Sequence, residues 1–142
     1  MISVLPATTT AQQLVLLQNH DILPGYDRLY RADEGGEEIG WISMRMDGDR
    51  VTIMQMEVLH CEDVDNPTDD DKLLVELMVR AASVYALNRM ILTVQYDVPE
   101  FRSVLKPFGF AEDEDGRFCI EVSRLIHRCG HCGEGKSEPN NE

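Results

Sequence analysis

The segment RVTIMQMEVL, residues 50–59, has the alternating pattern that governs the fold prediction. Successive side chains of a strand point to opposite faces of its sheet, so the segment separates into two rows. One row is almost entirely apolar: Thr52, Met54, Met56 and Val58. The other row is apolar at its ends and polar in its middle: Val51, Ile53, Gln55, Glu57 and Leu59. The segment is therefore predicted to be a strand that buries the first row and presents Gln55 and Glu57 on the other face.

The sequence before this segment predicts one helix and two further strands. The helix covers residues 7–20, where Thr10 and Gln13 have the spacing of a capping box. Its apolar side is formed by Leu14, Val15 and Leu17. Strands over 26–32 and 38–46 follow, and glycine-containing turns separate them from each other and from the segment. We therefore expect the three strands to form an antiparallel meander.

The sequence after the segment predicts a long helix followed by a buried strand. Thr68 and Asp71 have the spacing of a capping box for a helix over 69–88. Its buried stripe is predicted to be Leu74, Leu77, Met78, Ala81 and Tyr85. The short apolar run at 91–96 reads as a strand. A strand, a crossover helix and a second strand in one sheet place the two strands parallel.

Two more elements complete the predicted domain. A helix begins near Pro99 and ends at Gly109, and a last strand covers 116–125. The pattern predicts an α/β (α+β) fold, with a mixed, mostly antiparallel central sheet and flanking helices. We expect a single domain over residues 1–126 and a flexible tail, rich in Gly and containing Cys and His, over 127–142.

The composition limits the classes of partner. The chain of 142 residues has 26 acidic residues against 13 Lys and Arg, which gives a net charge of −13. This charge argues against nucleic acid and an anionic membrane as partners, and it is compatible with a cationic small molecule. The first ten residues lack the basic and apolar regions of a signal peptide, and no apolar run is long enough to span a bilayer. We therefore expect a cytoplasmic protein.

The order of the predicted elements resembles the GNAT superfamily of N-acyltransferases. The segment EIGWIS, residues 38–43, followed by a hairpin resembles the family's third strand. Phe108-Gly109-Phe110 after a short helix resembles its "GF" element. The resemblance covers residues 26–125. It implies a GNAT-like acyl-CoA N-acyltransferase fold, acetyl-CoA as the cofactor, and transfer of an acetyl group to a small-molecule amine.

The resemblance places the cofactor site before the long helix. There the family has an R/Q-x-x-G-x-G/A segment that binds the pyrophosphate of acetyl-CoA through backbone amides. The corresponding residues here are Leu59, Asn66, Thr68, Asp69 and Asp70. The basic residue of the motif is replaced by Asp65, and its glycines are absent. Six acidic residues in this stretch would repel a pyrophosphate: Glu62, Asp63, Asp65, Asp69, Asp70 and Asp71.

Glu57 is the candidate catalytic residue. It lies at the strand position where some GNAT enzymes have a general base for the amine, and a carboxylate there can accept a proton. The alternative is that Gln55 and Glu57 face solvent on a half-exposed strand. The tyrosine that often acts as the family's general acid corresponds to Leu105, so this role has no counterpart.

The C-terminal residues contain a cysteine–histidine cluster. Cys129, His131 and Cys132, preceded by His127, include a C-x-x-C pair that can supply two zinc ligands. A structural zinc site normally needs four ligands, so the set is incomplete and no metal site is assigned. The same four residues, 129–132, match the active-site sequence of protein disulfide isomerases. However, they follow a terminal strand rather than opening a helix, and a helix N-terminus is what lowers the pKa of a reactive cysteine.

Three functions remain open at the level of the sequence. The first is an acetyl-CoA-dependent N-acetyltransferase with Glu57 as its base and a cationic amine as its acceptor. The second is a non-catalytic GNAT-like module for binding or assembly that has lost the cofactor site, which the acidic stretch favours. The third is a metal-responsive or redox protein acting through the tail. An exposed edge strand would also allow a homodimer.

Overall fold

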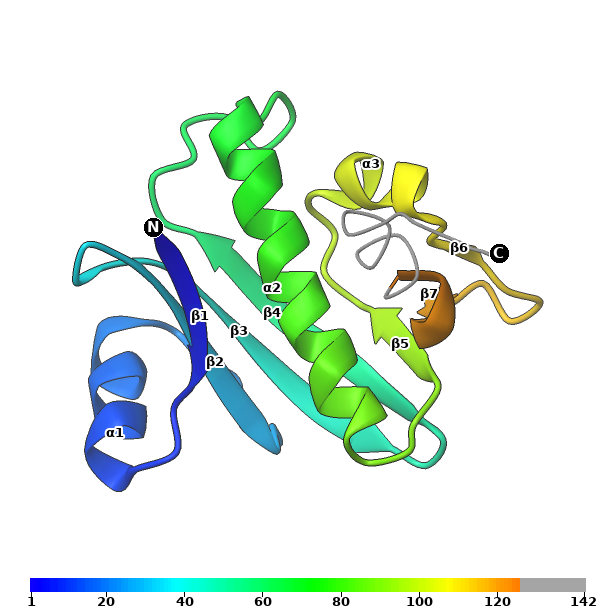
Figure 1. Cartoon of the computed structure of the whole chain (residues 1–142), viewed down its shortest axis with the longest axis horizontal. Coiled ribbons are helices and arrows are strands. Elements are labelled where there is room, and N and C mark those ends of the chain that lie inside the picture. Colours follow the sequence, from blue (N-terminus) through cyan, green and yellow to red (C-terminus); the bar gives the residue numbers. More distant parts are fainter. Residues whose placement is uncertain (126–142) are drawn as a thin grey trace, which may run out of the picture.

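The structure is a computed structural model that describes residues 1–125. The predicted tail over 127–142, with Cys129, His131 and Cys132, lies outside the described residues. The elements follow in the order β1 (Ile2–Pro6), α1 (Thr10–Asn19), β2 (Arg28–Glu34), β3 (Glu37–Asp47), β4 (Arg50–Val58), α2 (Asp69–Leu87), β5 (Thr93–Tyr96), α3 (Arg102–Leu105), η1 (Lys106–Phe108), β6 (Ala111–Glu112) and β7 (Phe118–Glu121) (Figure 1). No helix among the described residues is both long and apolar enough to cross a membrane.

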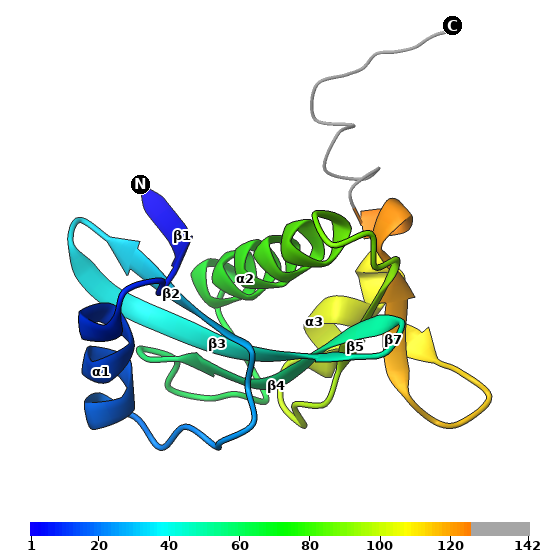
Figure 2. The same ribbon diagram turned by 90° about the horizontal axis from the view of Figure 1, so that it is seen from below.

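Within residues 1–125 the strands form one seven-stranded sheet in the order β1-β2-β3-β4-β5-β7-β6. Of these described strands, only β4 and β5 pair in parallel, and the other neighbours pair antiparallel. Helices α2 and α3 lie on the same side of the sheet, and α1 lies at the end formed by β1 and β2 (Figure 2). The main core lies under α2, and a smaller cluster packs beside α1: Ala7, Leu16, Leu29 and Trp41. The mixed, mostly antiparallel sheet with flanking helices confirms the predicted fold class.

The N-terminal part differs from the prediction in two ways. Residues 2–6 form β1, an edge strand that pairs antiparallel with β2, whereas the sequence pattern gave no strand there. Helix α1 begins at Thr10, and its capping box uses Thr9 and Gln12, one residue before the predicted pair. The predicted apolar side is exposed at all three positions, and Leu16 is the buried residue instead. The reason is that α1 covers only the small cluster under Trp41, so one row of the helix suffices.

Strand β4 contains a β-bulge that the two-row prediction did not include. Ser43 of β3 pairs with Gln55 and Met44 pairs with Ile53, so Met54 is an extra residue on β4. A bulge shifts the alternation of side chains by one position. As a result, Val51 and Ile53 share the buried core with Met56 and Val58: all four belong to the cluster under α2. The predicted assignment of Val51 and Ile53 to the face of Glu57 is therefore wrong.

The predicted parallel pair is confirmed. Strands β4 and β5 are adjacent and parallel, with pairing from Arg50 and Thr93 to Ile53 and Tyr96. Beyond this point β4 continues through the bulge to Val58, whereas β5 ends. The two strands therefore separate at their C-terminal ends, where the chain leaves β5 (Figure 1). The long helix also begins with the predicted capping box, in which Thr68 and Asp71 exchange hydrogen bonds.

The elements after β5 are shorter than predicted. The predicted helix from Pro99 to Gly109 is instead one turn of α-helix, α3, followed by the 3-10 turn η1. The predicted last strand over 116–125 is divided, because β7 ends at Glu121 and residues 122–125 are helical. The strand β7 forms a hairpin with the two-residue β6, which lies at the sheet edge.

Gly40 on β3 allows α2 to approach the sheet closely. A Cβ atom at this position would lie 2.8 Å from the Glu57 carbonyl oxygen on β4 and 3.3 Å from atoms of Leu74 and Met78 on α2. The carbonyl is part of the paired backbone and cannot move without disturbing the β3–β4 ladder. The helix and both strands thus meet at a point where only glycine fits.

We expect Gly40→Ala to lower the free energy of unfolding by about 1–3 kcal/mol, because the added methyl group overpacks this contact. Urea denaturation measures the change. Ser43→Ala on the same strand is the comparison. Ser43 is fully buried and its hydroxyl has no hydrogen-bond partner among the described residues, so its removal should leave stability unchanged or raised. Equal stability of Gly40→Ala and the wild type would contradict the close approach.

Candidate functional site

A polar cluster surrounds Glu57 on the face of the sheet opposite α2. The indole N–H of Trp41 donates a hydrogen bond to Glu57 Oε1 at 2.8 Å. His20 Nδ1 lies 3.6 Å from the same oxygen, and His20 Nε2 lies 2.5 Å from Glu38 Oε2. The imidazole also stacks on the Trp41 ring, with 5.4 Å between the ring centroids. One histidine therefore stands between two carboxylates, held against an indole.

Three elements position this cluster. Trp41 and Glu57 are directly opposite each other in the β3–β4 ladder, so their side chains share one face. His20 is the C-cap of α1, and its N–H donates to the Leu16 carbonyl. Glu38 reaches the same face because β3 also contains a bulge, at Ile39. There Ala32 pairs with Gly40 while Asp33 pairs with Glu38. Both bulges thus turn carboxylates toward the side of α1.

Gln55 fastens the loop after α1 to the sheet. Its side-chain oxygen accepts a hydrogen bond from the Leu23 N–H at 2.8 Å, and its amide donates to the Asp21 carbonyl at 3.1 Å. This tether holds the chain next to His20 against β4. Gln55 is therefore a partly exposed structural partner of the loop.

Glu57 is the accessible member of the cluster. The exposed fraction of its side chain is 50%, against 11% for His20 and 14% for Glu38. The sequence pattern predicted a row shared with Val51 and Ile53, whereas the neighbours of Glu57 are Trp41 and His20. A half-exposed carboxylate that already accepts one hydrogen bond retains lone pairs for a cationic ligand.

The predicted cofactor residues do not gather in one place. Asn66 and Asp69 line a groove between α2 and α3 with a volume of about 540 Å³. Thr68 and Asp70 line a separate pocket between α2 and β1. Leu59 packs against the cluster of Trp41, and its N–H donates to the Ile39 carbonyl.

The N-terminus of α2 is already capped by the protein itself. The Thr68 N–H donates to the Asp71 carboxylate at 3.0 Å, and the Asp71 N–H donates to the Thr68 hydroxyl at 3.1 Å. Earlier in the loop, the N–H groups of Asn66 and Asp65 both bond to Asp63. The first turn also carries Asp69, Asp70 and Asp71.

The residues at this helix end do not fit a pyrophosphate. An anion site at a helix N-terminus needs free N–H groups and a positive potential. Here internal oxygen atoms occupy four of the amides, and the carboxylates of the first turn cancel the positive end of the helix dipole. Among the charged residues that line the adjoining groove, Lys72 is a cation, but Asp65, Asp69 and Glu76 are acidic.

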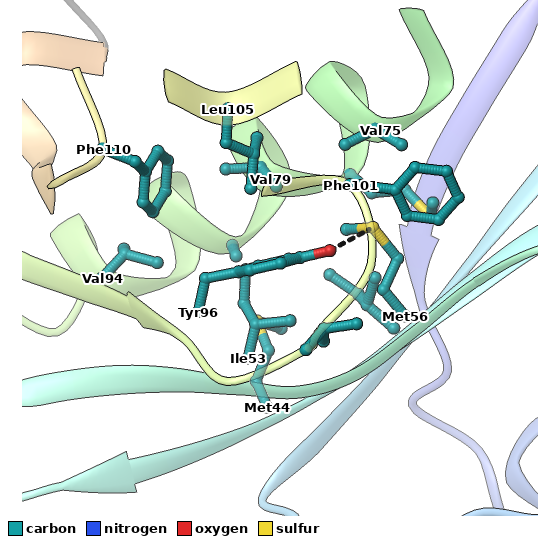
Figure 3. Close-up of a cluster of buried hydrophobic side chains, with 14 of the residues drawn as sticks. Met44, Ile53, Met56, Val75, Val79, Val94, Tyr96, Phe101, Leu105 and Phe110 are labelled. Carbon is teal, nitrogen blue, oxygen red and sulfur yellow. Dashed lines mark hydrogen bonds between the residues drawn. The ribbon is translucent and has the colours of Figure 1, made fainter. Parts of the chain in front are cut away.

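The space where β4 and β5 separate is filled by large side chains. Figure 3 shows Tyr96, Met56 and Phe101 grouped there, with Val75 of α2 above them. The Tyr96 hydroxyl donates to the Glu100 carbonyl at 2.8 Å and lies 3.6 Å from the Met56 sulfur. Burial raises the pKa of Tyr96, so the phenol is uncharged at neutral pH. Leu105, at the position of the family's tyrosine, is a buried core residue.

Sequence reasoning did not identify His20, Glu38 or Trp41 as site residues. Glu38 and Trp41 are three positions apart, which places them on opposite faces of a regular strand. Their meeting depends on the bulge at Ile39, which leaves no pattern in the sequence. His20 was placed at the end of a helix, but nothing in its neighbours indicated which strand that helix end contacts.

The sequence matches neither a family model nor a curated protein. Solved structures, however, share the fold. An acetyltransferase of the GNAT family from Staphylococcus aureus has a TM-score of 0.57 at 12% identity, over 86% of this chain and 99% of that one. The ribosomal-protein-S18-alanine N-acetyltransferase from Escherichia coli has a TM-score of 0.56 at 13% identity, over 86% of this chain and 94% of that one. The aminoglycoside 6'-N-acetyltransferase from Enterococcus faecium has a TM-score of 0.55 at 9% identity, over 86% of this chain and 97% of that one. The chain therefore has the GNAT fold.

We expect Asp71→Asn to destabilise the protein by about 0.5–1 kcal/mol at neutral pH. Burial opposes ionisation of Asp71, but the hydrogen bonds from Thr68 and the Cys61 thiol hold its pKa below its ordinary value. A carboxyl with a lowered folded pKa stabilises the fold above its unfolded pKa, and this contribution disappears as the pH falls through the folded value. Urea denaturation at neutral and at strongly acidic pH measures both limits.

Asp69→Asn is the matched control, because it removes the same charge from the same helical turn and leaves the capping box intact. Its loss of stability at neutral pH should be the smaller of the two. A difference between Asp71→Asn and the wild type that stays constant down to acidic pH would show that the Asp71 charge does not stabilise the cap.

Proposed function

We propose that this protein is a non-catalytic module of the GNAT fold that binds a cationic amine at Glu57 and has lost the cofactor site. The observation that carries the proposal is the capped, acidic N-terminus of α2, where Thr68 and Asp71 satisfy each other's amides. If the protein does not hold the pyrophosphate at α2, the carboxylate cluster on the face of α1 is still available to a ligand.

The cluster supports an ammonium ligand in two ways. Glu57 is half-exposed and oriented by the Trp41 N–H, so its free lone pairs have a fixed direction. The net charge of −13 attracts cations to the surface and so increases the rate at which they reach Glu57. One structural neighbour is named for acetylating an aminoglycoside, a ligand class that carries several ammonium groups.

Glu57→Gln should weaken the binding of spermidine by about tenfold, because a charge-assisted hydrogen bond is lost while the side chain keeps its shape. Ligand binding raises the melting temperature by mass action, so the shift caused by spermidine is the measurement. The shift should also decrease at high salt, since the attraction is screened.

Glu114→Gln is the matched control. Glu114 is exposed in the turn between β6 and β7, so this change removes one surface charge far from the cluster along the sheet. Its shift with spermidine should equal that of the wild type. Equal shifts in all three proteins would show that spermidine responds to the net charge alone, and the amine site at Glu57 would be rejected.

A second candidate function is an N-acetyltransferase that moves an acetyl group from acetyl-CoA to a cationic amine. The contact between Glu57 and His20 favours it, because a carboxylate beside an imidazole can accept the proton that an ammonium must lose before it reacts. An acyl-transfer assay over a panel of amines distinguishes the two functions. Turnover that Glu57→Gln abolishes and Glu114→Gln leaves unchanged would establish the enzyme and overturn the binding module.

A further inference from the structure

Two arginines lie close to one tyrosine ring, that of Tyr85 on α2. Arg89, just after α2, places its guanidinium carbon 3.7 Å from the centroid of the Tyr85 ring, and Arg28 of β2 lies 5.7 Å from the same centroid. Tyr30 meets Tyr85 edge-on, with 6.3 Å between the ring centroids. The four side chains come from the start of β2 and the end of α2, a region distinct from the cluster around Glu57.

Neither arginine of this pair has a carboxylate partner within residues 1–125, although acidic residues outnumber basic ones by two to one in the chain. Arg89 donates one hydrogen bond, to the Tyr85 carbonyl at 3.2 Å. Arg28 Nε is buried and has no hydrogen-bond partner in residues 1–125. Each guanidinium carries five N–H donors, so most of the donors of the pair have no acceptor within the described part of the protein.

Two like charges at one ring, without a counter-ion among residues 1–125, favour an anion that contacts both. In ordinary proteins guanidinium groups pair with carboxylates or phosphates, whose oxygen atoms match the spacing of their donors. Here the described residues, 1–125, supply no carboxylate partner. The ring of Tyr85 holds both cations in place through cation–π contacts, and this reduces the conformational freedom that a ligand would have to remove.

We propose that Arg28 and Arg89 bind the phosphate group of a small molecule. The two guanidinium charges match the charge of a phosphate monoester near neutral pH, about −1.5 to −2. A carboxylate would neutralise only one of them. The net charge of −13 disfavours a polyanion such as nucleic acid, so the ligand is a compact molecule with a single phosphate group.

The Tyr30 hydroxyl adds a neutral donor to the site. Burial raises the pKa of Tyr30, and the nearby guanidinium groups of Arg28 and Arg89 only partly offset that rise. The phenol therefore keeps its proton at neutral pH and has a hydrogen bond to offer.

Titration of the full chain with inorganic phosphate, followed by NMR at neutral pH and constant ionic strength, tests the site. We expect saturable shifts at Tyr85 and Arg89. Arg89→Gln should weaken binding by about tenfold, since it removes charge-assisted hydrogen bonds. Arg89 is exposed, so this variant should fold normally even if Arg28→Gln, which alters a partly buried residue, does not.

Arg102→Gln is the matched control. Arg102 also lies over an aromatic ring, 5.1 Å from the centroid of Phe118, and donates to the Val98 carbonyl. The change in net charge is the same, so phosphate affinity should stay at the wild-type value. The proposal is overturned if wild type shows no saturable shift, if Arg102→Gln weakens binding as much as Arg89→Gln, or if acetate binds as tightly as phosphate.

Discussion

The extra residue at Met54 in β4 is the constraint on which the rest of the structure depends. Before it, Val51 and Ile53 face α2 and pair beside β5; after it, Met56 and Val58 continue the core while Glu57 points to the opposite face. Without the bulge, strict alternation would place Glu57 on the core side together with Val51 and Ile53. The bulge therefore allows one strand to complete the core under α2 and still present a carboxylate on the side of α1.

The polar cluster on the side of α1 and the N-terminal end of α2 differ in the charge that they favour. On the side of α1, Glu57 is oriented by Trp41 and backed by His20, and the loop next to it is tethered to the sheet. On the side of α2, Thr68 and Asp71 cap the helix end, and large side chains occupy the separation between β4 and β5. The cluster around Glu57 suits a cationic ligand. The acidic end of α2 repels an anionic one. The shared fold by itself therefore does not establish a shared activity.

The sequence was most informative where the signals are local. The capping box of Thr68 and Asp71 lies within four residues. The strand–helix–strand order predicts that β4 and β5 are parallel, because crossover connections join parallel strands. The edge strand β1 was missed because its pairing with β2 joins residues about thirty positions apart. The contact of His20 with Glu38 and Glu57 depends on two bulges and a helix packing, so it follows from tertiary structure alone.

The capped, acidic end of α2 predicts that acetyl-CoA does not bind, and a single titration tests this. Calorimetric titration of the full chain with acetyl-CoA should give no binding heat beyond dilution, because the pyrophosphate would meet a capping box and a row of carboxylates. Saturable binding with a dissociation constant in the micromolar range would contradict this account. It would show that the GNAT fold here still holds its cofactor.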